Sequence, residues 1–524
     1  MNHDERPERA MRRIPTTVIP GTAVRRLGAR LLDPTTAVRV DGRVPEPTAY
    51  VGDVLLVSGL QGLPQFEDRF RSLEEAAKEI GYAVEPVPDD TLLGFARENG
   101  ILEQLDAVGH TAIRLVGTQR NAPPADAWEV LQSARARGVQ GVGLAHVMTS
   151  GGWGDGIGWG DGIGWGDGIG WGDGIGWGDG IGWGDGIGGG GGRFPVVWSA
   201  PVPNASFEDG PVVAVLDTGL GAHPWFDSGV ERHPDGSAAS LGVTFPAGHD
   251  PEDHGVTIDP VNGHLDRLAG HGTFIAGVIR QHCPDAHILS VPVMWGDGVA
   301  DEVDVVRALT GLYARQLLAT RDGDTDRAVH VVTLSLGYRH ESPGAFDDEE
   351  ALFRVLRGLA ALGVTVVAAV GNDASDVEFF PAAYAAQVTT GAPMVSVGAL
   401  NPDRRTVSVY SNTGPWVQAY LAATSVVSTM PTTFNASRRG QVLQQANAVA
   451  MPAVPTRGAV DTDDYSGGFG VWSGTSFAAP ALAGDIARGL GTRQAKGADE
   501  LGERARKVVA AVLEASGKAL EETP

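Results

Sequence analysis

Three mostly apolar runs without polar alternation constrain the fold of this chain most. They cover residues 211–216, 331–336 and 364–370. Such runs are typical of strands buried on both faces of a parallel sheet, whose functional groups gather at the carboxyl ends of the strands. An Asp-Thr-Gly sequence at 217–219 follows the first run directly, so we expect Asp217 at that edge. Taken alone, Asp-Thr-Gly also fits a simple turn.

A histidine opens the helix predicted after this strand. His271 follows a glycine, and residues 272–280 place four apolar side chains on one helical face. Three rivals, His249, His254 and His264, lie in a polar loop, and no apolar helix follows His254, which also precedes a glycine. A buried histidine can also be purely structural, but the position favours His271 as a functional base.

A serine lies at the start of another predicted helix. Ser476 stands in Gly-Thr-Ser-Phe-Ala-Ala-Pro at 474–480, and small apolar residues continue to Leu490. Pro480 suits the first turn of a helix, where backbone N–H groups lack partners. The positive end of the helix dipole would favour negative charge that develops near Ser476. The alternative is a simple N-cap role for this serine.

An acid, a base and a serine are together what acyl transfer to a serine requires. The serine hydroxyl needs a base to remove its proton, and the base needs an acid to orient it. Asp217, His271 and Ser476 supply these groups. Asn372 follows the run at 364–370, and its amide is a candidate donor to the oxyanion of a tetrahedral intermediate. Gly-Asn at 371–372 is also a common turn pair.

The three motifs, in the order Asp, His, Ser, resemble those of the subtilisin-like serine proteases, or subtilases. The resemblance covers roughly residues 195–490. It implies an α/β fold with a mostly parallel sheet and helices on both faces, an Asp217–His271–Ser476 triad and Asn372 as oxyanion donor. One departure is Phe274, where the family often carries a second histidine outside the triad.

The resemblance also implies a substrate site and an activity. Ser335, Leu336 and Gly337 match the segment that borders the substrate cleft in subtilases, to which the peptide adds as an extra strand. The implied function is a serine endopeptidase that acts through an acyl-enzyme. The alternatives are a processing protease dedicated to one peptide substrate and a non-catalytic interaction scaffold. The chemistry requires no cofactor.

Charge and composition exclude some classes of partner. The formal net charge of −24 argues against nucleic-acid binding, which requires basic surfaces. Acidic subtilases often bind calcium, but the sequence holds no motif for it, so we assign no metal ligands and keep a structural calcium ion as the alternative. The acidic residues Asp297, Asp301, Glu302 and Asp304 are interpreted as a solvated helix start.

The sequence predicts no leader, membrane span or disulfide. No apolar segment follows the N-terminal arginines, and no run reaches transmembrane length. We therefore expect a cytoplasmic protein by default, with secretion by another route as the alternative. The single cysteine, Cys283, cannot form an internal disulfide and is expected to pack as a small apolar residue.

A glycine-rich repeat divides the chain. Trp-Gly-Asp-Gly-Ile-Gly occurs six times without variation over 153–188, within a predicted flexible linker at 149–193. The alternative is an assembling segment, because identical apolar repeats can stack.

Before the linker, residues 48–148 alternate between strand and helix patterns, which predicts a small α+β, ferredoxin-like domain. Its position is similar to that of subtilase propeptides, which implies that this N-terminal domain acts as an inhibitor of its own protease. A substrate-recruiting or partner-binding module is the alternative. Residues 1–47 are predicted to be disordered or weakly ordered.

The peptidase domain is expected over 194–492, with a long surface insertion at 431–465. Residues 493–524 are predicted to form an amphipathic helix and a tail. The apolar stripe of this helix, which includes Leu501 and Val509, is expected to dock on the protease surface.

Overall fold

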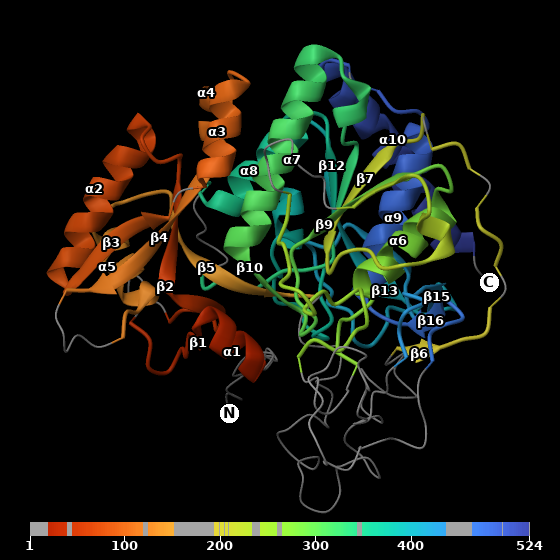
Figure 1. Cartoon of the computed structure of the whole chain (residues 1–524), viewed down its shortest axis with the longest axis horizontal. Helices are drawn as coiled ribbons and strands as arrows, with labels where there is room; N and C mark the ends of the chain where they lie inside the picture. Colours follow the sequence, from red (N-terminus) through yellow and green to blue (C-terminus); the bar gives the residue numbers. More distant parts are fainter. Residues whose placement is uncertain are drawn as a thin grey trace, which may run out of the picture.

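The computed structural model describes residues 19–522, except 39–43, 88, 119–123, 151–192, 199, 204, 208, 233–240, 259–264, 343–347, 436–463 and 495. The WGDGIG repeat, the centre of the 431–465 insertion and His264 therefore lie outside the described residues. Figure 1 shows two parts, one built from residues before the repeat and one from residues after it.

A seven-stranded parallel sheet forms the centre of the larger part. Its strands are β7 (Val212–Asp217), β8 (Val230–Arg232), β9 (His287–Pro292), β11 (Val331–Leu334), β12 (Thr365–Ala369), β13 (Met394–Leu400) and β14 (Ala419–Ala422). They follow the spatial order β14-β13-β12-β11-β7-β9-β8, and each neighbouring pair is parallel. The three apolar runs form β7, β11 and β12, all fully buried, so the predicted parallel α/β sheet is confirmed.

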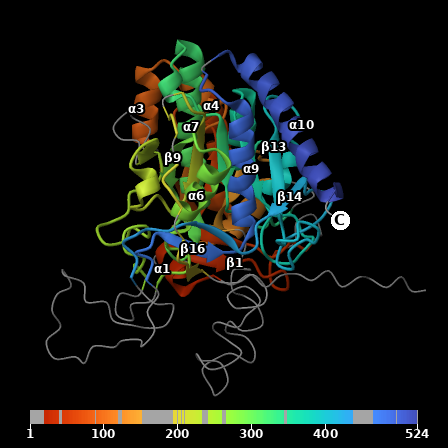
Figure 2. The same ribbon diagram turned by 90° about the vertical axis from the view of Figure 1, so that its right-hand side faces the viewer.

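Helices cover both faces of this sheet. In Figure 1, α6 (His271–His282), α9 (Thr475–Leu490) and α10 (Ala498–Glu522) lie on one side, and α7 (Glu302–Asp322) and α8 (Ala351–Ala361) lie on the other. Figure 2 shows α6 and α9 next to each other, with α10 along α9. A small antiparallel sheet, β15 (Val426–Thr429), β16 (Phe469–Trp472) and β6 (Phe194–Pro195), lies below them.

The strand order reverses direction at β7. The chain passes from β7 through α6 to β9 on one side, and β11 later pairs on the other side. In parallel sheets a crevice forms at the carboxyl ends of the strands where the order switches. Asp217 is the last residue of β7 and therefore lies at this point.

The smaller part has a sheet of its own. Its strands are β2 (Ala49–Ser58), β3 (Tyr82–Val87), β4 (His110–Gly117) and β5 (Val142–Thr149), in the order β5-β2-β4-β3 with antiparallel neighbours. Two helices, α2 (Pro64–Glu79) and α5 (Ala127–Ala136), pack on one face and enclose a separate core around Phe66, Leu73 and Trp128.

The other face of this small sheet belongs to the main core. Leu56 and Val147 are part of the same buried cluster as the central sheet. A strand of the larger part, β10 (Val299–Asp301), pairs antiparallel with β5 and extends the small sheet by one strand. The two parts thus share both a core and a sheet.

Several elements differ from the sequence expectations. The helix α1 (Gly21–Leu27) and strand β1 (Ala29–Leu31) lie in the range for which little order was predicted. Contacts with later parts of the chain order both elements: β1 pairs with β2, and Arg26 of α1 forms an ion pair with Asp297 of the larger part. The helices α3 (Asp90–Glu98) and α4 (Leu102–Asp106) had not been predicted.

The C-terminal helix and the cysteine follow the predictions. On α10, Leu501, Ala505 and Val509 are buried against the rest of the chain, so the expected docking of this helix is confirmed. Cys283 is buried and free, and burial raises the pKa of its thiol to about 11.

Candidate active site

Asp217 and His271 form a buried pair at the switch point of the sheet. His271 Nδ1 lies 2.7 Å from Asp217 Oδ1, and both side chains are about 1% exposed. His271 is the first residue of α6, and a Cβ at Gly272 would collide with the carbonyl oxygen of Gly219. The glycines of both motifs therefore allow the two turns to come close enough for this hydrogen bond.

Ser476 lies on the other side of the same site. It is the second residue of α9 and is 1% exposed. The hydroxyl of Ser150, from the end of the smaller part, lies 3.3 Å from Ser476 Oγ and 3.4 Å from His271 Nε2. The Ser150 hydroxyl thus contacts both Ser476 and His271, and His271 in turn contacts Asp217. Asp217, His271 and Ser476 therefore lie close together at one site.

The start of α9 differs from the sequence prediction. Pro480 is the sixth residue of the helix and not part of its first turn. Because proline has no N–H, the helix cannot supply the usual donor to the carbonyl of Ser476, four residues earlier. The hydroxyl of Ser335 donates to that carbonyl at 3.0 Å instead. Ser335, assigned to the substrate cleft from sequence, therefore uses its side chain to support the helix that carries Ser476.

Asn372 is held in a fixed orientation. Its Oδ1 accepts hydrogen bonds from both the N–H and the Oγ1 of Thr475, each at 2.9 Å. Since the carboxamide oxygen is occupied there, the amide nitrogen points away from Thr475 as the donor end of the group. Asn372 is 2% exposed and lies beside the start of α9. This role of Thr475 was not predicted, because a residue next to a motif serine carries no separate signal in the sequence.

Glu252 connects the two motifs and was also missed. Its Oε2 accepts from the Thr273 hydroxyl at 2.6 Å, and its Oε1 accepts from the Gly272 N–H at 3.1 Å and from the Thr218 hydroxyl. Burial raises the pKa of this carboxyl to about 7, although the threonine hydroxyls oppose the shift. Glu252 comes from a polar loop, where the sequence shows nothing that distinguishes it from exposed acids.

Aromatic residues surround the imidazole. His271 packs edge-on against Trp472 with ring centroids 5.3 Å apart, and Phe274 packs on Phe477 at 4.5 Å. Phe274 is completely buried in this cluster. The departure from the family pattern at 274 is therefore a packing residue beneath the site.

The end of β5 lies between two backbone segments, β10 on one side and Gly337 on the other. We call the space between these segments the groove; the strand in it ends at Ser476. Thr149 and Gly337 exchange both backbone hydrogen bonds at 2.8 Å, and Ser150 N–H donates to Gly298 O at 3.3 Å. On its other edge the strand pairs with β10. Gly337 thus pairs by its backbone with an extended segment of the same chain. Leu336, by contrast, is a fully buried core residue.

The acidic residues near α7 are a helix start, but two of the four, Asp297 and Glu302, are buried and not solvated. Asp301 is the N-cap of α7 and accepts from Val303 N–H at 3.0 Å. Asp297 and Glu302 are 7% and 3% exposed and bind Arg26 and His146 of the smaller part. A run of acidic residues before a helix is usually exposed, so the sequence predicts solvent contact. Asp297 and Glu302 are instead covered by the smaller part, which contributes Arg26 and His146.

The remaining described candidates, His249 and His254, lie in the loop that precedes α6. His249 hydrogen-bonds to the carbonyl of Ala247, and His254 lies near Asp253. Within the described ranges, no cluster of three or more His, Cys, Asp or Glu side chains has an arrangement suited to a metal ion. No described helix combines the length and hydropathy needed to cross a bilayer.

Two known proteins are similar in sequence to part of this chain. The sequence is 27% identical over 232 residues to "Thermophilic serine proteinase" of Bacillus sp. (strain AK1), a match that covers 42% of this chain and 46% of the relative. It is 28% identical over 228 residues to "Subtilisin BL" of Lederbergia lenta, covering 44% and 69%. The chain thus spans about half the length of the first relative.

A solved structure and a family model also match. The structure is fervidolysin from Fervidobacterium pennivorans, described as a keratinolytic enzyme related to subtilisin. The match has a TM-score of 0.42 and 15% sequence identity, and it covers 84% of this chain and 54% of fervidolysin. The family model, described as the subtilase family, matches residues 208–501, more than half of the chain. The chain therefore belongs to the subtilase family of peptidases.

Proposed function

We propose that the protein is a serine endopeptidase that acts through Asp217, His271 and Ser476. The observation that carries the proposal is the convergence of the three side chains, with an extended segment of the chain already lying against them. The proposal rests on the 2.7 Å contact between His271 Nδ1 and Asp217 Oδ1 and on the contacts of the Ser150 hydroxyl with the other two groups.

The proposed reaction uses side chains and water. Ser476 Oγ attacks the carbonyl carbon of the peptide bond while His271 Nε2 takes the hydroxyl proton. Asp217 keeps the imidazole oriented and stabilises its charge. Asn372 and the backbone N–H of Ser476 donate to the oxyanion. His271 then gives its proton to the leaving amine, and water hydrolyses the acyl-enzyme by the same steps.

We further propose that the N-terminal domain is ferredoxin-like and inhibits the protease. The strand order β5-β2-β4-β3, with two helices on one face, supports the fold assignment. The inhibitory role is supported by residues 147–150, which are hydrogen-bonded between β10 and Gly337 and end at Ser476. A peptide substrate would need the same backbone partners, so it could bind only after this strand leaves.

The test is the intact mass of the full chain beside its Ser476→Ala variant, measured under denaturing conditions. The wild type is expected to break close to Ser150, because the Ser150 hydroxyl lies 3.3 Å from Ser476 Oγ. The variant is expected to stay whole and to hydrolyse peptides at least about 10⁴-fold more slowly. Equal peptide hydrolysis by both chains would refute Ser476 as the nucleophile. Two unbroken chains, with an active wild type, would mean that the N-terminal domain stays tethered.

A further inference from the structure

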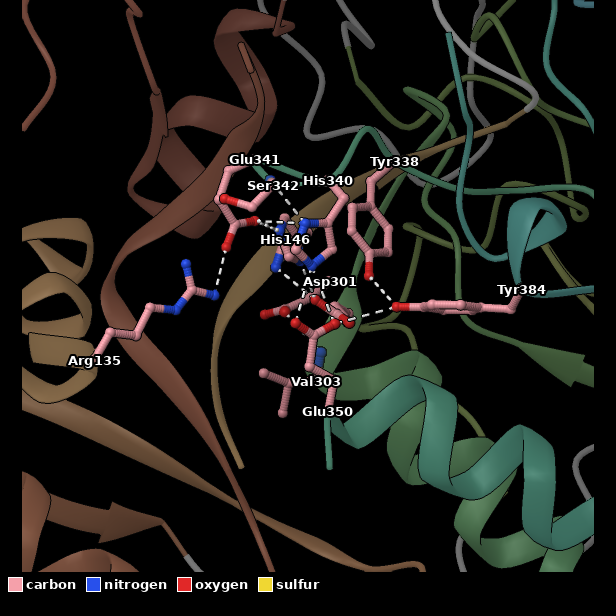
Figure 3. Close-up of polar contacts among 11 residues, drawn as sticks. Arg135, His146, Asp301, Val303, Tyr338, His340, Glu341, Ser342, Glu350 and Tyr384 are labelled. Atoms are coloured by element: carbon pink, nitrogen blue, oxygen red, sulfur yellow. Dashed lines mark hydrogen bonds and ion pairs between the residues drawn. The ribbon is translucent and has the colours of Figure 1, made fainter. Parts of the chain in front are cut away.

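A polar pocket surrounds His146, four residues before Ser150 on the same strand. His146 Nδ1 lies 2.6 Å from Glu302 Oε2, and Nε2 lies 3.0 Å from Glu341 Oε2. The backbone N–H of His146 also donates to Glu302 at 2.8 Å. The ring stacks on Tyr338 with centroids 3.9 Å apart. Figure 3 shows His146 close to Tyr338 and Glu341.

The pocket holds His146 as a cation. An ionised carboxylate only accepts hydrogen bonds, so both ring nitrogens of His146 must carry protons to satisfy both glutamates. Burial by itself would lower the pKa of His146, but Glu302 and Glu341 raise it to about 10. His146 is 3% exposed, and its charge is therefore compensated inside the protein and not by water.

The walls of the pocket continue the peptide-binding groove. Glu302 follows β10 directly, and Tyr338 and Glu341 follow Gly337 within four residues. These two segments are the edges that flank residues 147–150. The pocket therefore belongs to the protease and lies on the amino-terminal side of any peptide bound as this strand is bound.

Departure of the strand would remove the His146 cation from both glutamates and leave Glu302 without its hydrogen-bond partner. Among the described residues, the Glu302 carboxylate hydrogen-bonds to His146 alone. Glu341 also binds Arg135 of the N-terminal domain at 2.8 Å and lies 3.5 Å from His340 Nδ1. Loss of one partner from a buried ion pair is strongly destabilising, so the empty pocket would favour a new positive charge.

We propose that Glu302 and Glu341 form an acidic subsite that selects a cationic side chain in peptide substrates, four residues before the residue that occupies the position of Ser150. This inference rests on the proposed endopeptidase function. His146 occupies the subsite in the inhibited chain, and a substrate histidine, lysine or arginine occupies it during turnover. Binding energy gained away from the cleaved bond raises kcat/KM for such substrates.

The test uses internally quenched peptides with the sequence of residues 144–152. Four peptides carry His, Lys, Gln or Glu at the position of His146. The full chain is expected to hydrolyse the Lys peptide at least about tenfold better in kcat/KM than the Gln peptide, mostly through KM, and the Glu peptide worst. Equal kcat/KM for the Lys and Gln peptides would overturn the subsite.

Variants of the pocket identify the residues responsible. Glu302→Gln and Glu341→Gln keep the side-chain shape but remove one charge each, and each is expected to reduce the preference for Lys to less than about threefold. Glu231→Gln is the matched control. Glu231 lies on β8, the edge strand of the central sheet, and pairs with Arg315 of α7. A preference that survives both pocket variants would contradict the assignment.

The outcomes separate the subsite from the proposed function. The strand at residues 147–150 could block the groove so that the wild type hydrolyses none of the peptides. In that case the His146→Gln chain is assayed, because this substitution removes the cation that holds the strand to Glu302 and Glu341. Failure of both chains to cleave any peptide would refute the endopeptidase function. If His146→Gln releases activity but all four peptides are cleaved alike, the pocket only anchors the N-terminal domain, and the subsite is refuted while the function stands.

Discussion

Single residues other than the proposed catalytic groups hold the candidate site together. Glu252 receives hydrogen bonds from both the Asp217 turn and the start of α6, so that one carboxylate fixes the position of two motifs. Thr475 orients Asn372 in a similar way. Positioning by such neighbours keeps reacting groups in place without direct contact with a substrate.

Glu252 also makes stability depend on pH. The pKa of its carboxyl is raised from 4.5 to about 7, so the folded chain retains a proton that the unfolded chain loses in this range. This contribution to stability is therefore lost as pH rises from about 4.5 to about 7. In a Ser476→Ala background, Glu252→Gln is expected to reduce that decline by about 3 kcal/mol, since each pKa unit corresponds to ~1.4 kcal/mol.

Urea unfolding of the two chains at about pH 5 and about pH 8 measures this difference. A Glu252→Gln chain whose stability changes with pH as much as its parent would show that Glu252 does not titrate in this range.

At the scale of elements, α9 depends on a strand for one of its hydrogen bonds. Pro480 removes the helical donor to the Ser476 carbonyl, and Ser335 at the end of β11 replaces it. The position of the proposed nucleophile is thus coupled to the central sheet. A sequence pattern places Pro480 and Ser335 in separate elements and does not connect them.

Ser335→Ala is expected to lower the free energy of unfolding by about 1–3 kcal/mol, because the Ser476 carbonyl would be buried without its donor. Pro480→Ala returns an N–H to the helix and should reduce the cost of Ser335→Ala by about 1 kcal/mol. A double-mutant cycle in the Ser476→Ala background measures this coupling and cancels the packing loss at 480. Additive effects of the two substitutions would contradict the replacement of one donor by the other.

The strand at residues 147–150 is the element that the proposed inhibition depends on. Thr149→Pro removes the N–H that donates to Gly337 O at 2.8 Å, and it should weaken the strand in the groove. The full chain with this substitution is expected to hydrolyse added peptides at least about tenfold faster than wild type.

Thr149→Val is the control, because it changes the side chain but keeps the backbone donor. If Thr149→Pro and Thr149→Val give the same initial rate, backbone pairing does not restrain the enzyme.

At the scale of the whole molecule, the N-terminal domain and the protease form a continuous structure. They share a core that includes Leu56 and Val147, and β10 extends the small sheet. Ion pairs surround this interface, among them Arg26 with Asp297 and Arg69 with Glu349. In those two pairs the arginine is 20% exposed. In the pairs of His146 with Glu302 and Glu341, by contrast, all three side chains are at most 5% exposed.

His146 therefore links the stability of the assembly to pH. Its pKa is raised from 6.5 to about 10 despite burial, so its contribution is complete below about pH 6.5 and is lost as pH rises toward 10. The pKa of Glu341 is lowered well below 4.5 by His340, His146 and Arg135 against the effect of burial, so its contribution is lost only in acid. The interface should be strongest between about pH 4.5 and 6.5.

The measurement compares urea unfolding of Ser476→Ala with and without His146→Gln at about pH 6, 8 and 10. The stability difference between the chains is expected to shrink as pH rises, because the wild-type imidazole loses its charge. A difference that is constant over this range would show that His146 is not held as a cation.

Short-range patterns in the sequence determined the parallel sheet, the positions of Asp217, His271, Ser476 and Asn372 at its edges, and the docking stripe of α10. These features follow from local properties: burial on both faces requires apolar runs, and close turns require glycine. Tertiary structure alone decided the roles of Glu252, Ser335 and His146. The sequence does not connect any of them with its hydrogen-bond partners, which are at least 20 residues away and come within hydrogen-bonding distance only on folding.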